Sequence, residues 1–231
     1  MECNTQIKGE RKIMETNEIS NTAILAGTVK SAPVISHQIE GENFLDFEVE
    51  VERLSKTVDV IPVTVSERTE NAGNIQVGDN VLMHGQYRSH NKNINDKNRL
   101  ILHFFAKDIE PAKENEKLND VKLVGYICKT PVYRKTPFER EICDILLAVN
   151  RTTNYHRSDY IPCIFWGRNA RFVSNLEVGT KLEVSGRIQS RKYIKTQENG
   201  AVEEKTAYEV SCQNVAILES SLKKVDEERI I

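Results

Sequence analysis

The chain has 231 residues, of which 39% are hydrophobic and 29% charged, so it is long enough for one or two domains with packed cores. Its 32 Lys/Arg and 34 Asp/Glu give a formal net charge of −2, which excludes a uniformly basic nucleic-acid-binding protein. The sequence has no run of about 18 apolar residues, so we expect neither a transmembrane helix nor a membrane partner.

Residues 1–20 are polar and lack the apolar segment of a secretory signal, which predicts a poorly ordered N-terminal arm. The number of cysteines is odd, no CxxC pair occurs, and four of the five lie in apolar, strand-like runs: Cys3, Cys128, Cys143, Cys163 and Cys212. Free Cys is a small core hydrophobe in such runs. We therefore expect a cytoplasmic protein with reduced thiols and without a metal or other cofactor.

An internal repeat divides the chain. Gly27 and Gly125 lie 98 positions apart, and each is followed six positions later by a proline, Pro33 and Pro131. Further similar blocks recur in the same order at offsets of 98 to 106: 44–53 with 142–151, 61–62 with 161–162, 77–85 with 178–186, and 107–109 with 213–215. Because the offset changes only between apolar runs, where loops absorb insertions, we expect two copies of one domain.

In chain order, the repeat predicts a first domain at 21–111, a short charged linker at 112–118, a second domain at 119–219 and a short polar tail at 220–231. A linker of this length separates the domains but allows only a short distance between them. The two halves differ in charge, with a net of −4 over residues 22–111 and +7 over residues 119–195. Since local charge steers a polyanion, the second domain is the better candidate for binding one.

The second copy shows the strand pattern more clearly. Its predicted strands are 121–132, 141–150, 160–166, 181–190 and 207–216, with a short helix at 169–175 and a turn at 198–200. The first copy has the same layout, with a weaker helix near 72–73 and a polar, mobile connection at 91–98. Five strands with a helix between the third and fourth are typical of the OB-fold. We therefore predict an all-β chain of two tandem OB-folds, each a five-stranded Greek-key barrel.

Aromatic and basic residues gather between positions 160 and 193. Tyr160 and Trp166 share one parity, so they face the same way on a strand, and Arg187, Arg191 and Tyr193 share a face on the next strand. Rings that stack on bases and cations that hold phosphates are the chemistry of a single-stranded nucleic-acid site. The alternative for the tryptophan is a place in the core under the helix.

Residues 119–193 resemble the bacterial single-stranded DNA-binding protein family. The resemblance rests on VKLVG at 121–125, YIPCIFWG at 160–167, and the segment 179–186 that leads into RIQSRKY at 187–193. It implies an OB-fold that binds single-stranded DNA, with base-stacking roles for Tyr160, Trp166 and Tyr193. It also implies four OB domains per assembly, which would make this chain a homodimer.

Further site residues are predicted around these rings. Eight basic side chains could hold phosphates: Arg151, Arg157, Arg168, Arg171, Arg187, Arg191, Lys192 and Lys195. Arg187 and Arg191 are favoured because they share a face with Tyr193, and the predicted site takes Arg151, Arg168 and Lys192 in addition. Tyr155 lies in the loop between the second and third strands, where the family places further stacking groups. The spacing of this loop departs from the family pattern, which weakens that assignment.

The first copy lacks the three rings, because Val60, Ser66 and Lys92 occupy the aligned positions. Its second strand presents three outward glutamates on the usual nucleic-acid face of an OB-fold: Glu48, Glu50 and Glu52. Carboxylates repel phosphate, so we expect weak binding by this domain. Arg88 and Lys92, near Tyr87, are the residues through which the first domain could still bind nucleic acid weakly.

No HExxH, GxGxxG, Walker or GxSxG motif occurs, so no enzymatic activity is predicted. We expect a sequence-nonspecific protein that protects or organises single-stranded DNA in replication, recombination or repair. RNA stays open as a ligand, because stacking and phosphate contacts do not test for the 2′-OH. The alternative is an OB-fold interaction module of a replication or primosome assembly. The long tail with an acidic tip that is usual in the family is missing, which places recruitment of replication proteins through it in doubt.

Overall fold

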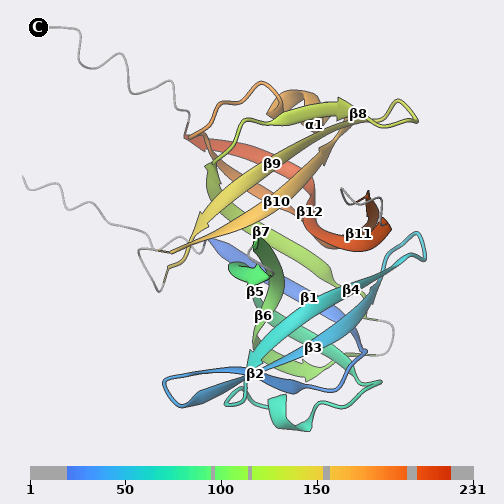
Figure 1. Ribbon diagram of the computed structural model, residues 1–231, viewed down its shortest axis with the longest axis vertical. Coiled ribbons are helices and arrows are strands. Elements are labelled where there is room, and N and C mark those ends of the chain that lie inside the picture. The colour runs from blue at the N-terminus through green and yellow to red at the C-terminus, as the bar shows by residue number, and fades with distance from the viewer. Residues whose placement is uncertain (1–19, 95–96, 114–115, 153–156, 197–201, 220–231) are drawn as a thin grey trace, which may run out of the picture.

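The computed structural model describes residues 20–94, 97–113, 116–152, 157–196 and 202–219. Two β-barrels lie one beside the other along the long axis of the molecule (Figure 1). The N-terminal half of the chain forms one barrel and the C-terminal half the other, as the repeat predicts. In the described residues, no helix is long and apolar enough to cross a membrane.

The elements of the first barrel are β1 (Asn21–Val29), β2 (Val34–Ile39), β3 (Glu42–Glu52), β4 (Val58–Ser66), the 3₁₀ helix η1 (Ala72–Asn74), β5 (Asn80–Ile94) and β6 (Lys97–Pro111). Those of the second are β7 (Asn119–Ile127), β8 (Val132–Lys135), β9 (Glu141–Asn150), β10 (Ser158–Trp166), α1 (Gly167–Val173), β11 (Lys181–Thr196) and β12 (Val202–Glu219). In each barrel the first strand pairs antiparallel with the third: β1 pairs with β3, and β7 pairs with β9. The parallel pairs β4–β6 and β10–β12 complete the Greek-key arrangement.

Two sequence predictions are wrong in detail. The predicted strand 121–132 is two strands, because β7 ends at Ile127 and the short edge strand β8 begins after Pro131, which has no N–H for a sheet ladder. The described residues of the polar segment 91–98 are strand, since Asn91–Ile94 of β5 pair in register with Lys97–Leu100 of β6. Pairing across a hairpin satisfies the backbone whatever the polarity of the side chains. The predicted turn at 198–200 lies outside the described residues.

The two barrels share one twelve-stranded sheet, because the first half of β1 pairs antiparallel with β7. Ala23 faces Val121, which is its own counterpart at the repeat offset of 98, so a pseudo-twofold axis passes through this pair. The linker between β6 and β7 is not the only connection between the domains. Continuous backbone hydrogen bonding joins them into one body.

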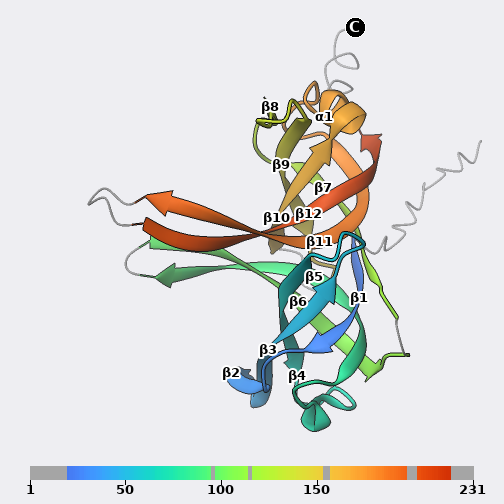
Figure 2. The same ribbon diagram turned by 90° about the vertical axis from the view of Figure 1, so that its right-hand side faces the viewer.

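Two long hairpins project from the same side of the molecule (Figure 2). One is β5–β6 of the first barrel and the other is β11–β12 of the second. Each also crosses onto the opposite barrel, because β5 contacts β10 and β11 contacts β4. The strand that carries Arg187, Arg191 and Tyr193 therefore lies at the junction of the two domains.

The barrel interiors follow the period-two pattern of the sequence. Ile161, Cys163 and Phe165 are buried on β10, and Phe165 is among the largest fully buried side chains. Gly186 lies at a register shift between β11 and β12, where a Cβ atom would come within 2.1 Å of the Ser211 carbonyl oxygen. The same close approach occurs at Gly85 of the first barrel, which explains why the repeat retains these glycines.

Candidate nucleic-acid interface

Strand β10 presents its two aromatic rings to solvent. The exposed fractions of Tyr160 and Trp166 are 41% and 40%, whereas Phe165 is fully buried. Trp166 is thus not a core tryptophan under the helix. One residue of the same parity, Ile164, departs from the pattern, since only 3% of it is exposed. It lies opposite Ser211 in the parallel pair β10–β12, where the barrel closes over it.

A groove of about 450 Å³ runs beside Trp166. Its lining combines that ring with five arginines and one glutamate, and the charged residues are Arg53, Arg134, Arg140, Arg187, Arg191 and Glu209. Ile142 and Ile164 add apolar surface. An aromatic platform in a basic groove is suited to a polyanion whose bases have exposed faces.

The favoured arginines lie on β11 in this groove. Arg191 places its guanidinium 5.9 Å from the ring centre of Tyr193, and its Nε lies 4.0 Å from a carboxylate oxygen of Glu209. Gln189, which shares their parity, is buried and donates a 2.8 Å hydrogen bond to Glu209. Glu209 therefore orients the groove side chains and offsets part of their charge.

The remaining predicted residues are more dispersed. Tyr193 is 38% exposed on the β11–β12 hairpin. Its neighbour Lys192 forms a 2.7 Å ion pair with Glu204, and this hydrogen bond raises the pKa of the lysine. Arg168 is exposed at the start of α1, just after Gly167, whose φ of +54° favours glycine at this strand-to-helix turn.

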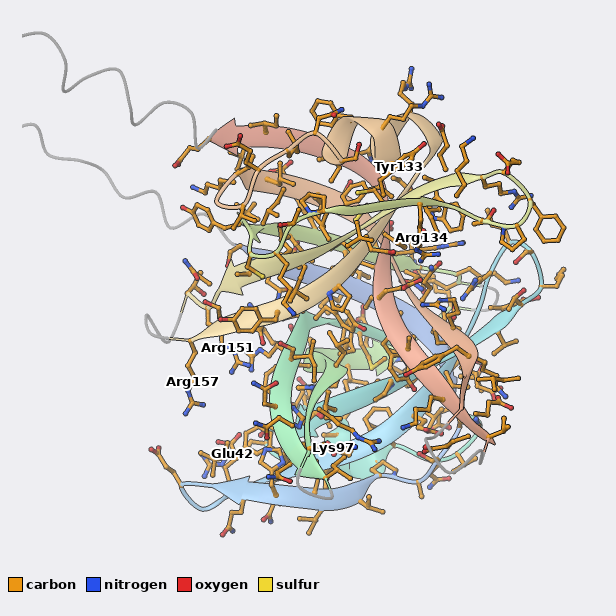
Figure 3. All side chains as sticks on the ribbon, turned by 45° about the horizontal axis from the view of Figure 1, so that its top comes forward. Glu42, Lys97, Tyr133, Arg134, Arg151 and Arg157 are labelled. Carbon is orange, nitrogen blue, oxygen red and sulfur yellow. The ribbon has the colours of Figure 1, made fainter. Side chains whose placement is uncertain are left out.

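Arg151 does not line the groove. Arg151 forms a bidentate ion pair with Asp159 at 2.7 and 3.0 Å and also donates to the carbonyl of Ser89 in the first barrel. It lies at the end of the second barrel away from Arg134 (Figure 3). Tyr155 lies outside the described residues. The structure thus brings Trp166, Arg187 and Arg191 together and leaves Arg151 at the domain junction.

Sequence reasoning missed three arginines of the groove and one exposed ring. Arg134 and Arg140 flank the β8–β9 turn, and Phe138 between them is 86% exposed. Tyr133 and Arg134 lie on β8 beside this turn, and Arg134 pairs with Asp144 at 2.9 Å (Figure 3). The interleaving of basic and aromatic residues at 133–140 was the available signal. Arg53 had no local signal, because it reaches the groove from the other domain.

The equivalent face of the first barrel is different. The outward glutamates of β3 are present, but lysines accompany them: Lys30 lies 3.8 and 3.9 Å from Glu48 and Glu50, and Lys56 lies 3.3 Å from Glu52. The linker supplies a further lysine, Lys117, to Glu52. These pairs reduce the repulsion that a bare carboxylate ladder would produce.

Of the residues suggested for weak binding by the first domain, Lys92 is exposed, but Tyr87 and Arg88 are engaged in the barrel. Tyr87 is fully buried, and the Arg88 guanidinium stacks 3.8 Å from the ring centre of Phe105. Burial lowers the pKa of Arg88 to about 10. This face has instead a pocket of about 230 Å³ beside His90 and His103, whose rings lie 5.3 Å apart.

The four described cysteines, Cys128, Cys143, Cys163 and Cys212, are free thiols, as the sequence predicts, and three of them are buried. Burial raises the pKa of the Cys143 thiol to about 11. Among the described residues, no group of three or more His, Cys, Asp or Glu side chains could hold a metal ion.

Fold and site together define a tandem OB-fold protein with one aromatic, arginine-rich groove. Residues 118–218, which span the second domain, match the model of the Single-strand binding protein family. Single-stranded DNA-binding protein 1 of Staphylococcus aureus (strain COL) is 42% identical over 107 residues, which are 44% of this chain and 62% of that protein. Single-stranded DNA-binding protein A of Bacillus subtilis (strain 168) is 39% identical over 107 residues, 44% of this chain and 60% of that protein.

The chain thus spans about three fifths of the length of the curated relatives that it matches. Among solved structures, wild-type single-stranded DNA binding protein from Thermus aquaticus is similar with a TM-score of 0.67 and 22% identity. The match covers 86% of this chain and 93% of that one. This likeness confirms the fold prediction of two tandem OB-folds across both halves of the chain.

Proposed function

We propose that this protein binds single-stranded DNA without strong sequence preference and protects or organises it in replication, recombination or repair. The observation that supports this most directly is Trp166, which stands 40% exposed in a groove lined by five arginines. A ring that the core does not need is available to stack on a base. The second domain, over residues 119–219, is the binding unit in this proposal.

Within this proposal, Trp166, Tyr160 and Tyr193 stack on bases, and Arg187 and Arg191 hold phosphates in the groove. Arg168 and Lys192 extend the path at its margins. Arg151 does not hold phosphate in this proposal, because its guanidinium is already paired with Asp159 at the domain junction. No step of this function requires a bond to be made or broken.

The decisive experiment is the Trp166→Ala variant. Removal of one stacking ring weakens binding of oligo(dT) by about 1–3 kcal/mol, or roughly 5- to 150-fold, while the melting temperature is retained. Phe172→Ala is the matched control, because Phe172 is an equally exposed ring (44%) on α1 that does not line the groove. Affinities are measured by anisotropy of a labelled oligonucleotide. Unchanged affinity in a folded Trp166→Ala protein would refute the stacking role.

The wild-type protein offers a second, direct measurement. Trp166 is the single tryptophan of the chain, so its fluorescence reports on the groove alone. Saturation with oligo(dT) quenches this signal, and log K falls with log salt at a slope of about −0.7 per phosphate neutralised. The same titration with oligo(rU) tests RNA. A protein-docking module, the alternative function, would show neither quenching nor salt dependence.

We also propose that the working protein is a cytoplasmic homodimer. The sheet ends at β2, an edge strand with exposed apolar side chains: Val34, Ile35 and Ile39 are 60%, 66% and 54% exposed. Such an edge is suited to contact with a further chain. Light scattering after size exclusion tests the assembly, and a monomeric mass at micromolar concentration would refute it. Replication proteins are the partners that this function would require.

A further inference from the structure

Two equivalent clasps join the barrels, related by the pseudo-twofold axis. Each consists of an arginine and an aspartate from one barrel and a serine from the long hairpin of the other. We call them the Arg53 clasp (Arg53, Asp59, Ser190) and the Arg151 clasp (Arg151, Asp159, Ser89). The corresponding residues lie 98 to 101 positions apart, at the offsets of the repeat.

In the Arg53 clasp, the first barrel holds the backbone of β11. The buried Asp59 carboxylate receives hydrogen bonds from the Ser190 N–H at 2.6 Å and the Ser190 hydroxyl at 2.8 Å. Arg53 donates to the same carboxylate through Nε at 2.6 Å and Nη2 at 2.5 Å, and Nη2 also donates to the Ser190 carbonyl at 2.8 Å. The residue held in this way directly precedes Arg191.

The Arg151 clasp repeats this geometry with the domains exchanged. Asp159 receives the Ser89 N–H at 2.7 Å, and Arg151 Nη2 donates to the Ser89 carbonyl at 3.1 Å. The clasps differ in what lies beside them. Arg53 lines the arginine-rich groove together with Trp166, whereas the pocket on the matching face of the first barrel is lined by His90 and His103 and does not include Arg151.

Arg53 also has donors left for a ligand. Its contacts with the described residues use Nε and Nη2, so the two N–H groups of Nη1 are not engaged by them. The side chain is 18% exposed, and it is one of the residues that line the groove. A guanidinium that is fixed on one side and open on the other is well organised to hold a phosphate oxygen.

We propose that Arg53 of the first barrel is a phosphate-binding residue of the second barrel's groove, so that the nucleic-acid site is composite. The proposal rests on the single-stranded DNA binding proposed above. It gives the first domain a part in binding although that domain lacks the stacking rings. One guanidinium then both joins the domains and contacts the ligand.

The test compares two double variants, Arg53→Gln/Asp59→Asn and Arg151→Gln/Asp159→Asn. Each removes one positive and one negative charge at equivalent positions and keeps amide groups that can still pair, so net charge is equal in the two proteins. Binding of oligo(dT) is measured from about 50 to 300 mM NaCl. We expect the Arg53 pair to reduce the salt slope by about 0.7 and the low-salt affinity about two- to fivefold, and the Arg151 pair to leave the slope unchanged.

Equal salt slopes in the two double variants would overturn the proposal. A loss of affinity in the Arg53 double variant without a change of its salt slope would also overturn it, because Arg53 would then only position β11. If the double variants do not fold, Arg53→Lys is compared with Arg151→Lys. Weaker binding only in Arg53→Lys is then expected, and equal binding overturns the proposal. Trp166→Ala reports separately on the proposed function, so failure of either idea is recognised by itself.

Discussion

Removal of the Asp59 carboxylate is the most informative test of what holds the two domains together. Asp59→Ala deletes the acceptor of two hydrogen bonds from Arg53 and two from Ser190. The carboxylate is fully buried, so the variant leaves a guanidinium without its counter-ion and a backbone N–H without its acceptor. Stability should fall, although no atom of the hydrophobic core has changed.

The magnitude follows from burial. Breaking a buried ion pair by removing one partner costs about 3–5 kcal/mol. Arg53 keeps 18% exposure, so water can reach the guanidinium, and we expect the lower end, about 3 kcal/mol. For a chain of this size that corresponds to a fall in melting temperature of about 6–12 °C. The exposed pair of Lys135 and Glu139 is the control, and Lys135→Ala should not change the melting temperature measurably.

The assay is scanning calorimetry at pH 7 and at lower pH. Burial by itself would raise the pKa of Asp59, but hydrogen bonds from Arg53 and Ser190 outweigh it, and the net pKa is lowered. Its stabilising contribution is therefore complete above the unfolded value of about 3.9 and is lost as the pH falls through the folded value. The difference between wild type and Asp59→Ala should shrink below pH about 4. Equal melting temperatures at pH 7 would refute the reasoning.

Two further predictions concern a bulge and a partly buried imidazole. Gly186→Ala places a Cβ atom 2.1 Å from the Ser211 carbonyl oxygen. It should lower the free energy of unfolding, measured by urea titration, by about 1–3 kcal/mol. Gly73 has open space around it, so Gly73→Ala is the control and should leave this free energy unchanged. Burial, with a smaller effect of the His90 charge, lowers the pKa of His103 to about 4, so wild type should lose stability as the pH falls from about 6.5 to 4. His103→Leu should flatten this pH dependence, and an unchanged slope would contradict the assignment.

The architecture of each barrel was predictable because it depends on local patterns. Alternation along β10 predicted the buried Phe165 and the exposed Trp166, and the repeat offsets predicted the two-domain layout. Backbone geometry explains the retained glycine at position 186, where no side chain fits. These features are visible because the responsible residues lie within one strand or recur at a fixed distance.

The junction between the domains was not predictable in this way. The contacts of Arg53 and Asp59 with Ser190 join residues more than 130 positions apart, and nothing in the surrounding residues indicates them. The long hairpins were missed for a related reason, since polar residues at 91–98 indicate a loop unless the partner strand is known. Arg53 consequently remained outside the predicted site, although it lines the same groove as Trp166.

The pairing of β1 with β7 also sets an order of events during synthesis. β1 leaves the ribosome 98 residues before its partner, and at about 5–20 residues per second it waits roughly 5–20 s with one edge unpaired. The strand is apolar, and two nascent chains on neighbouring ribosomes could pair through it. Because the partner is encoded in the same polypeptide, its local concentration rises as soon as residue 127 emerges. Covalent duplication thus shortens the period in which this edge can pair with another molecule, an advantage that two separate copies of one barrel would not have.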